Sequence, residues 1–327
     1  MISSLRDVFS FIDEASRNHL CLDASEADFA VRKFVKRSPA EVDRFELIGK
    51  TFIEGYNLAL LGKAPIATII NSSNATPSHL GFYSEGVAMG AAIADALPSL
   101  NSKNLDKWIA QERAQYDYLN HIGAGWALAK VPWRKKKILD VLNPTWKWLA
   151  FDGLGFHDTY FYHEKITKGW KRKRLKGYEG RAYDQGVGRA LWFVACGDLA
   201  IAKELIDHLD CNSDRGQDLW SGLGLAITYA GGELPNSPEN IIDSRYLPSL
   251  AQGCAFALEA RSKQGFFPKN CKEVAKLLIP SISINDCVAL VKESLSEVRN
   301  RNVDEQYEFW RVRVRDKLSK NLCGGRI

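Results

Sequence analysis

Apolar residues recur along most of this chain at intervals of three and four, which is the spacing of one face of an α-helix. Seven of the apolar runs have a glycine near the middle, and successive glycines are 29 to 39 residues apart. A glycine inside a helix costs about 1 kcal/mol relative to alanine, so its repetition indicates close contact between neighbouring helices. The runs align on Gly55, Gly86, Gly125, Gly155, Gly188, Gly224 and Gly253.

These runs predict an all-α fold built from αα-hairpin repeats. A second small residue lies two positions before the aligned glycine in six runs, and alanine lies two positions after it in five. In the fifth unit, Gly197 is typical of a helix end and Asp198 of a helix start, and a second periodic run follows. About seven Gly-centred units then form either a toroid or a curved solenoid, and the sequence leaves both arrangements open.

The repeat divides the chain into three regions. Residues 1–50 precede it and predict two amphipathic helices, which start near Asp23 and at Ser38, where Pro39 and Glu41 complete a capping pattern. Residues 51–262 form the helical-repeat domain. Residues 263–327 contain two further helices, over 285–301 and 304–320, which we expect to pack on the repeat domain.

The composition is that of a globular protein, with 46% hydrophobic and 25% charged residues. No apolar stretch is long enough to cross a membrane, and acidic residues stand where a signal peptide needs an apolar block. The seven cysteines are an odd number without a CxxC pair, which predicts neither a disulfide framework nor a metal site. We therefore expect a cytoplasmic protein.

Charge and motifs argue against several classes of function. The chain has 44 basic and 39 acidic residues, and the net charge of +5 is too small to indicate nucleic-acid binding. The sequence contains no phosphate-binding loop, no dinucleotide fingerprint and no nucleophile elbow. No cofactor is predicted.

Five strings within residues 45–262 resemble the landmarks of a known family. They are similar, in content and order, to those of the bacterial domain-of-unknown-function family seventeen-oh-two, which is found beside enediyne and other natural-product gene clusters. The resemblance implies a role in secondary metabolism and assigns no catalytic residue. The strings are GFYSEGVAMGAAIAD, FDGLGFHDTYF, YDQGVGRALWF, DLWSGLGLAITYAGG and LAQGCAFALEAR.

Polar side chains in these small and apolar runs are the candidate catalytic groups. Glu85 lies directly beside Gly86, and a carboxylate there must be paired or have a raised pKa. His157 stands where five other runs have alanine, and Asp158 follows it. A structural His157 and a helix-start role for Asp184 remain open alternatives. The candidates for proton transfer are Glu85, His157, Asp158 and Asp184.

Aromatic and basic residues supply the candidate binding groups. Aromatic rings can line a site for a long polyene or stabilise a cation, and they can equally fill core space opposite the glycines. Basic clusters at 134–137 and 165–176 fit an acidic carrier protein, a membrane surface or simply a solvated loop. The candidate substrate-binding residues are Tyr160, Arg189, Trp192, Trp220, Arg172 and Arg174.

Two functions from different classes follow. The first is a cofactor-independent enzyme of natural-product biosynthesis, of cyclase or lyase type, which binds a long hydrophobic polyene, polyketide or isoprenoid intermediate in a helical cavity and acts on it by acid–base chemistry. The second is a non-catalytic helical-repeat protein that binds a partner or a hydrophobic product. Carboxylate and histidine side chains that converge on a cavity favour the first.

Overall fold

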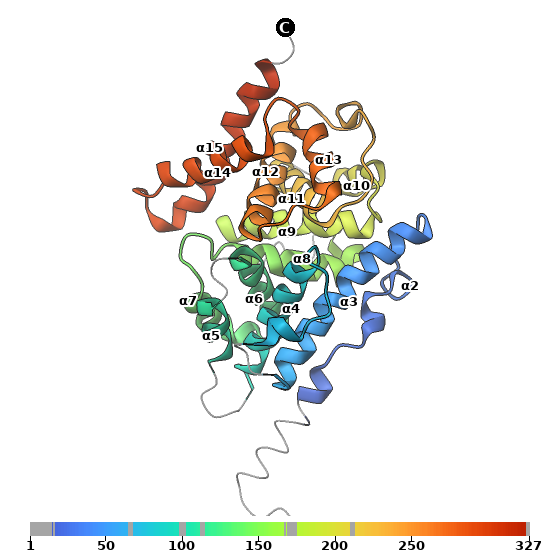
Figure 1. Ribbon diagram of the computed structural model, residues 1–327, viewed down its shortest axis with the longest axis vertical. Coiled ribbons are helices and arrows are strands. Elements are labelled where there is room, and N and C mark those ends of the chain that lie inside the picture. The colour runs from blue at the N-terminus through green and yellow to red at the C-terminus, as the bar shows by residue number, and fades with distance from the viewer. Residues whose placement is uncertain are drawn as a thin grey trace, which may run out of the picture.

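A computed structural model describes residues 15, 17–64, 68–97, 103–111, 115–166, 168, 175–209 and 213–324, with the backbone alone at 213 and 321–324. Every regular element in these ranges is a helix, which confirms the predicted all-α class (Figure 1). Seven helices, called the inner helices below, pack extensively each against the next in chain order. They are α3 (Pro39–Leu61), α4 (Leu80–Ala94), α6 (Asp117–Lys130), α8 (Leu149–Ile166), α9 (Tyr178–Val194), α11 (Ser213–Ala230) and α12 (Leu247–Lys263).

Shorter elements precede, connect and follow the inner helices. As predicted for the fifth unit, α9 is followed by Gly197 with a φ of 71° and by Asp198, whose side chain caps the helix that follows. Short helices also lie in the connections from α4 to α6 and from α6 to α8. The remaining elements are η1 (Ala24–Ala27), α2 (Phe29–Arg32), η2 (Ile69–Ser72), α5 (Asn104–Gln111), η3 (Pro132–Arg134), α7 (Lys135–Val141), α10 (Leu199–Asp207), η5 (Pro238–Asn240), α13 (Lys269–Leu278), α14 (Ile284–Glu297) and α15 (Val303–Gly324).

Neighbouring inner helices run parallel and touch backbone to backbone. A Cβ atom added to Gly86 of α4 would lie 2.0 Å from the carbonyl oxygen of Phe52 in α3, and one added to Gly90 would lie 2.3 Å from that of Tyr56. The contact points advance in the same direction along both helices, which is the pattern of a parallel pair. The connections therefore return the chain to the starting end each time.

The glycines work in pairs, one facing the preceding helix and one facing the next. A Cβ on Gly153 would lie 2.0 Å from the carbonyl oxygen of Ile122 in α6, and a Cβ on Gly155 would lie 2.0 Å from that of Tyr183 in α9. The glycine that faces the preceding helix, called the first glycine below, is Gly86, Gly123, Gly153, Gly186, Gly222 or Gly253, and four of these six helices have a second glycine two positions later that faces the next helix.

This geometry corrects the sequence alignment at two places. Gly86 and Gly253 are first glycines, whereas the alignment matched them with second glycines such as Gly188. The second position in these two helices holds Ala88 and Ala255 instead. Because no glycine stands at the second position of these two helices, an alignment of glycine on glycine moves by two residues to the first glycine.

The start of α3 follows its local sequence. Ser38 caps the helix by accepting from the backbone N–H of Glu41, and Pro39 occupies the first turn, as predicted. The helix then continues without a break to Leu61. The predicted boundary between residues 50 and 51 thus falls inside the first inner helix, because α3 belongs to the repeat along its whole length.

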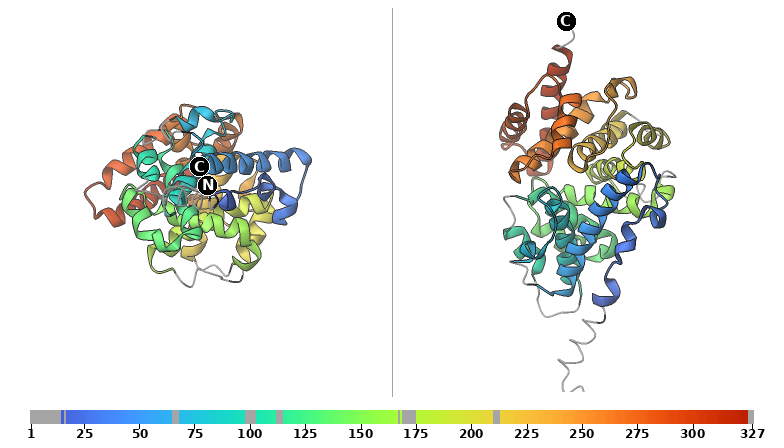
Figure 2. Two further views of the ribbon diagram at one scale, coloured as in Figure 1. Left: turned by 90° about the horizontal axis from the view of Figure 1, so that it is seen from below. Right: turned by 45° about the vertical axis from the view of Figure 1, so that its right-hand side comes forward.

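The row of inner helices curves without closing. Among the described residues, α3 and α12 do not share the extensive packing that joins consecutive helices, and the chain climbs from α3 and α4 at one end to α12 and α15 at the other (Figures 1 and 2). The curvature brings distant helices together, with the rings of Phe52 and Trp126 at 4.5 Å and those of Phe82 and Tyr229 at 5.2 Å. The fold is a curved solenoid with an enclosed interior.

Candidate functional site

The inner helices and α15 enclose a cavity along the inside of the solenoid. Its volume, measured as the space open to the centres of water molecules, is about 100 Å³, several times what a single water needs. The walls are mainly apolar and aromatic. Half-buried Leu22, Glu26 and Phe161 belong to the lining, so the cavity approaches the surface beside the N-terminal segment. Its aromatic lining includes Phe52, Phe82, Trp126, Phe156, Phe193 and Trp310.

The register of the glycines determines which residues face the cavity. In four inner helices the residues three and seven positions after the first glycine both line the cavity. They are Phe156 and Tyr160 in α8, Arg189 and Phe193 in α9, Leu225 and Tyr229 in α11, and Phe256 and Ala260 in α12. Residues four apart lie on one face of a helix. The same register therefore fixes the contact between helices and the side chains that enter the interior.

Glu85 and Arg189 place a charged group of each sign on this apolar wall, and Asp152 joins them. The indole N–H of Trp126 donates to Glu85 Oε1 at 3.0 Å. Arg189 Nη2 lies 3.8 Å from the same oxygen, and Arg189 Nε lies 3.1 Å from Asp152 Oδ1. The guanidinium also lies over the ring of Phe156, 4.8 Å from its centre. These side chains bring two carboxyl groups and one cation together from three helices.

Burial changes the protonation of both carboxyl groups. Glu85 is 4% exposed, and loss of water raises its pKa to about 7 against the opposing attraction of Arg189. Burial likewise raises the pKa of Asp152 to about 6, again against Arg189. Near neutral pH, the pair can therefore hold one carboxylic acid beside one carboxylate, which is the arrangement that general acid–base chemistry needs.

The raised pKa of Glu85 predicts a stability that falls as pH rises. Between about pH 4.5 and pH 7 the unfolded chain has already released this proton while the folded chain still holds it. We expect the free energy of unfolding of the wild-type protein to fall by about 2 to 3 kcal/mol more than that of Glu85→Gln between pH 5 and pH 8. Urea unfolding of both proteins across this range measures it, and parallel profiles would contradict the buried, protonated Glu85.

Of the sequence-predicted residues, Glu85, Arg189 and Tyr160 line the cavity. The hydroxyl of Tyr160 is buried without a hydrogen-bond partner among the described residues. Asp152 is not among the sequence-predicted site residues, although it is a polar residue within an inner helix. In the corrected register, Glu85 and Asp152 occupy equivalent positions, one residue before the first glycine of their helices. The sequence alignment matches Gly86 with Gly155 instead, so it does not show this equivalence.

The other predicted catalytic residues lie outside the cavity lining. His157 Nδ1 is 3.2 Å from Asp158 Oδ1, and its ring stands edge-on to Trp126. The hydroxyl of Tyr183 donates to Asp158 at 3.2 Å. His157 therefore contacts Trp126, the cavity residue that is hydrogen-bonded to Glu85, without lining the cavity itself, and Asp158 is outside the lining as well.

Three more predicted residues have partners away from the interior space. Asp184 forms an ion pair with Arg215 at 3.2 Å. Trp192 donates to the carbonyl of Gly231 at 2.7 Å, and Trp220 stacks on Tyr246. None of the three predicted residues belongs to the described lining of the cavity.

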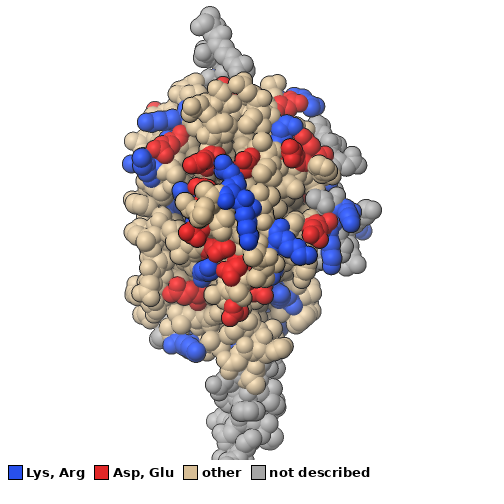
Figure 3. Space-filling model, turned by 90° about the vertical axis from the view of Figure 1, so that its right-hand side faces the viewer, with Lys and Arg blue, Asp and Glu red and all other residues tan. Residues whose placement is uncertain are grey.

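The basic clusters are only partly described. Arg172 and Arg174, with most of the 165–176 segment, lie outside the described residues. In the 134–137 cluster, Lys135 pairs with Glu179 at 2.7 Å and Lys136 with Asp140 at 2.7 Å, while the neighbouring Trp133 is 72% exposed. On the face drawn in Figure 3, basic and acidic side chains are interspersed rather than gathered by sign.

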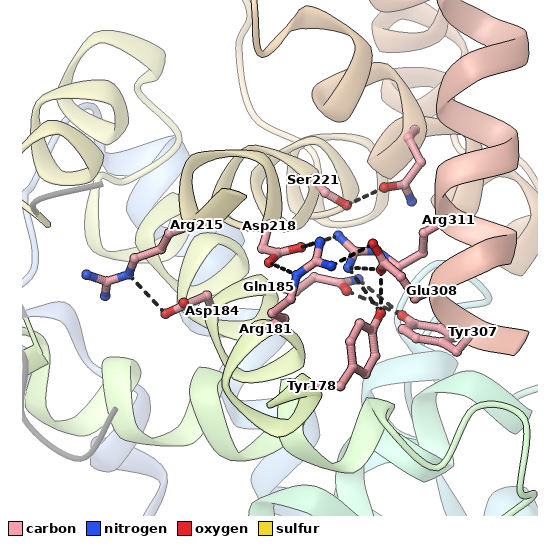
Figure 4. A network of polar contacts seen from close by, with 11 residues as sticks. Tyr178, Arg181, Asp184, Gln185, Arg215, Asp218, Ser221, Tyr307, Glu308 and Arg311 are labelled. Carbon is pink, nitrogen blue, oxygen red and sulfur yellow. Dashed lines mark hydrogen bonds and ion pairs between the residues drawn. The ribbon is translucent and has the colours of Figure 1, made fainter. Parts of the chain in front are cut away.

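Helix α15 closes part of the cavity and is held there by a buried polar network (Figure 4). Arg311 Nη2 lies 2.9 Å from Asp218 Oδ1, and Arg181 of α9 reaches both Asp218, at 2.9 Å, and Glu308 of α15, at 2.8 Å. Tyr307 and Trp310 of the same helix line the cavity. The sequence does not predict that α15 lies at the site. This helix lacks the repeated glycine pattern, so its sequence does not indicate which of its residues face the cavity.

Comparison with known proteins gives a family but no function. The family model described as "Protein of unknown function (DUF1702)" matches residues 11–318, nearly the whole chain, and the chain belongs to this family. No curated protein and no solved structure matches it. Within the described residues, no helix is both long and apolar enough to cross a membrane, and no group of three or more His, Cys, Asp or Glu is placed to hold a metal ion.

Proposed function

We propose that this protein binds an elongated, largely apolar small molecule in its central cavity and that Glu85 exchanges a proton with that molecule. The observation that carries the proposal is one buried carboxyl group, with a pKa of about 7, on the wall of an apolar cavity. Polyene, polyketide and isoprenoid intermediates have the required shape and polarity. The association of the resembled family with natural-product gene clusters supports biosynthesis as the setting.

The residues around Glu85 have distinct parts in such a proton transfer. Protonated Glu85 acts as the acid, and the indole N–H of Trp126 holds one of its oxygens in place. When Glu85 gives up its proton, the resulting carboxylate faces the nearby guanidinium of Arg189, which limits the cost of a buried charge. The ring of Phe156 already carries the guanidinium of Arg189, and the aromatic ring of Trp126 in the same lining stabilises positive charge that develops on the bound molecule.

The alternative is a protein that holds the same kind of molecule without changing it. The same cavity serves both functions, so they differ only in what Glu85 does. A carrier needs the shape and apolar walls of the cavity. An enzyme needs, in addition, a proton that is available at Glu85.

Replacing Glu85 with glutamine in the native organism separates the two. The amide cannot supply the proton, so we expect the product to fall by about a hundredfold or more and its precursor to accumulate. Comparative mass spectrometry of extracts from the parent and Glu85→Gln strains, at matched protein levels, measures the change.

Two variants serve as controls for this experiment. Asp184→Asn removes a buried carboxylate outside the cavity lining, and His157→Ala places alanine at a register that already holds it in α6, α9, α11 and α12. We expect both strains to keep their product. An unchanged product in the Glu85→Gln strain would refute proton transfer and favour the carrier.

A further inference from the structure

We infer that the molecule bound in the cavity is uncharged and presents a hydrogen-bond-accepting oxygen, a carbonyl or a hydroxyl, to Arg189. The inference rests on the proposed function and names the polar group of its substrate class. It is carried by a buried guanidinium whose donors are incompletely used, set in an otherwise apolar wall.

Arg189 has more donors than partners. Its side chain is 7% exposed. Nε lies 3.1 Å from Asp152 Oδ1 but is not aligned for a hydrogen bond, and Nη2 lies 3.8 Å from Glu85 Oε1, beyond hydrogen-bond distance. A guanidinium carries five N–H donors. Within the described residues, donors of Arg189 thus remain for an acceptor in the cavity that this side chain lines.

The charge around Arg189 favours an uncharged partner. Two buried carboxyl groups, Glu85 and Asp152, already share this one cation. Arg311 also attracts Asp152, but it has carboxylate partners of its own in Asp218 and Glu308. With Glu85 or Asp152 protonated, these two groups and Arg189 sum to zero, and with both ionised they sum to −1. A carboxylate or phosphate on the ligand would add a further negative charge in a region of low dielectric, where an unbalanced charge is costly.

The same groups favour a ligand that accepts a hydrogen bond. Arginine offers donors and no acceptor, and protonated Glu85 carries a further O–H donor in the lining of the same cavity. The rest of the lining is mainly hydrocarbon and aromatic. A neutral carbonyl or hydroxyl oxygen on an apolar chain satisfies these donors without adding charge, whereas a pure hydrocarbon leaves them unsatisfied.

A matched series of twelve-carbon probes tests the inference on the wild-type protein. Diphenylhexatriene, a neutral polyene that fluoresces in apolar surroundings, is bound first and then displaced at pH 7 by dodecanol, dodecanoate or dodecane. We expect dodecanol to displace it at a concentration about tenfold or more below that of either other probe, because hydrogen bonds to a charged group are worth at least this factor.

Variants of the buried Arg189 and the partly buried Arg215 locate the effect. Arg189→Met should reduce the preference for dodecanol over dodecane to within about twofold, and Arg189→Lys, which keeps a charged donor, should restore part of it. Arg215→Met is the matched control, since Arg215 pairs with Asp184 and does not belong to the described lining. It should keep the full preference.

The outcomes separate this inference from the proposed function. Equal displacement by dodecanol and dodecane, or the tightest binding by dodecanoate, would overturn the neutral oxygen while leaving the cavity as a binding site. A preference for dodecanol that survives Arg189→Met would overturn the role of Arg189. If diphenylhexatriene does not bind the wild-type protein, apolar binding in the cavity is refuted, and the inference is refuted with it.

Discussion

Gly188→Ala is expected to destabilise the protein by about 3 kcal/mol or more, although it adds only one methyl group. The new Cβ would lie 2.0 Å from the carbonyl oxygen of Leu219 in α11. Overpacking usually costs about 1 to 3 kcal/mol when side chains can yield. Here the obstacle is the backbone of a neighbouring helix, so α9 and α11 must move apart along a contact that the repeat keeps short. Urea unfolding of the variant measures the loss.

Gly180→Ala is the matched control in the same helix. Its Cβ would lie no closer than 3.8 Å to the carbonyl oxygen of Leu175, which is an ordinary contact. Alanine is the better helix former, so we expect this variant to be more stable than the wild-type protein by about 0.5 to 1 kcal/mol. Similar stabilities for the two variants would contradict the close helix contact at Gly188.

Arg311→Met is expected to cost about 3 to 5 kcal/mol, the usual result of removing one partner from a buried ion pair. The Arg311 side chain is 1% exposed and contacts Asp218 at 2.9 Å and Glu308 at 3.2 Å. Without it, two carboxylates share the remaining cation, Arg181. The loss should appear in the free energy of unfolding. Binding of diphenylhexatriene should also weaken, because α15 forms part of the cavity wall.

Arg313→Met removes an ion pair from the same helix at an exposed position. The Arg313 side chain is 54% exposed and pairs with Glu297 of α14. Exposed ion pairs contribute little because water and salt screen them, so we expect the free energy of unfolding of this variant to stay close to that of the wild type. If Arg311→Met lowered the free energy of unfolding as little as Arg313→Met does, the result would contradict the role of the buried network in holding α15 on the solenoid.

The sequence alone determined the features that depend on neighbours along the chain. Apolar residues at helical spacing, the Ser38 cap and the Gly197–Asp198 break all act within one or two turns, and they fixed the all-α class and several helix ends. The recurrent glycines are also recognisable in the sequence. Each one lowers the stability of its own helix relative to alanine, and nothing within that helix compensates for the loss. Glu85 stood out for a similar reason, as a charge in a small and apolar run.

Only the tertiary structure decided which residues meet. Because Ala88 and Ala255 occupy positions where other inner helices have a glycine, the sequence alone did not align the inner helices correctly. It therefore did not show that Glu85 and Asp152 occupy equivalent positions. The contacts of Arg189 with these two carboxyl groups join α9 to the preceding helix α8 and to α4, which lies much earlier in the chain. The position of α15 depends on ion pairs across helices. The pKa values near 7 and 6 likewise arise from burial that the whole solenoid creates. Contacts and desolvation of this kind are properties of assembled surfaces, so no local pattern encodes them.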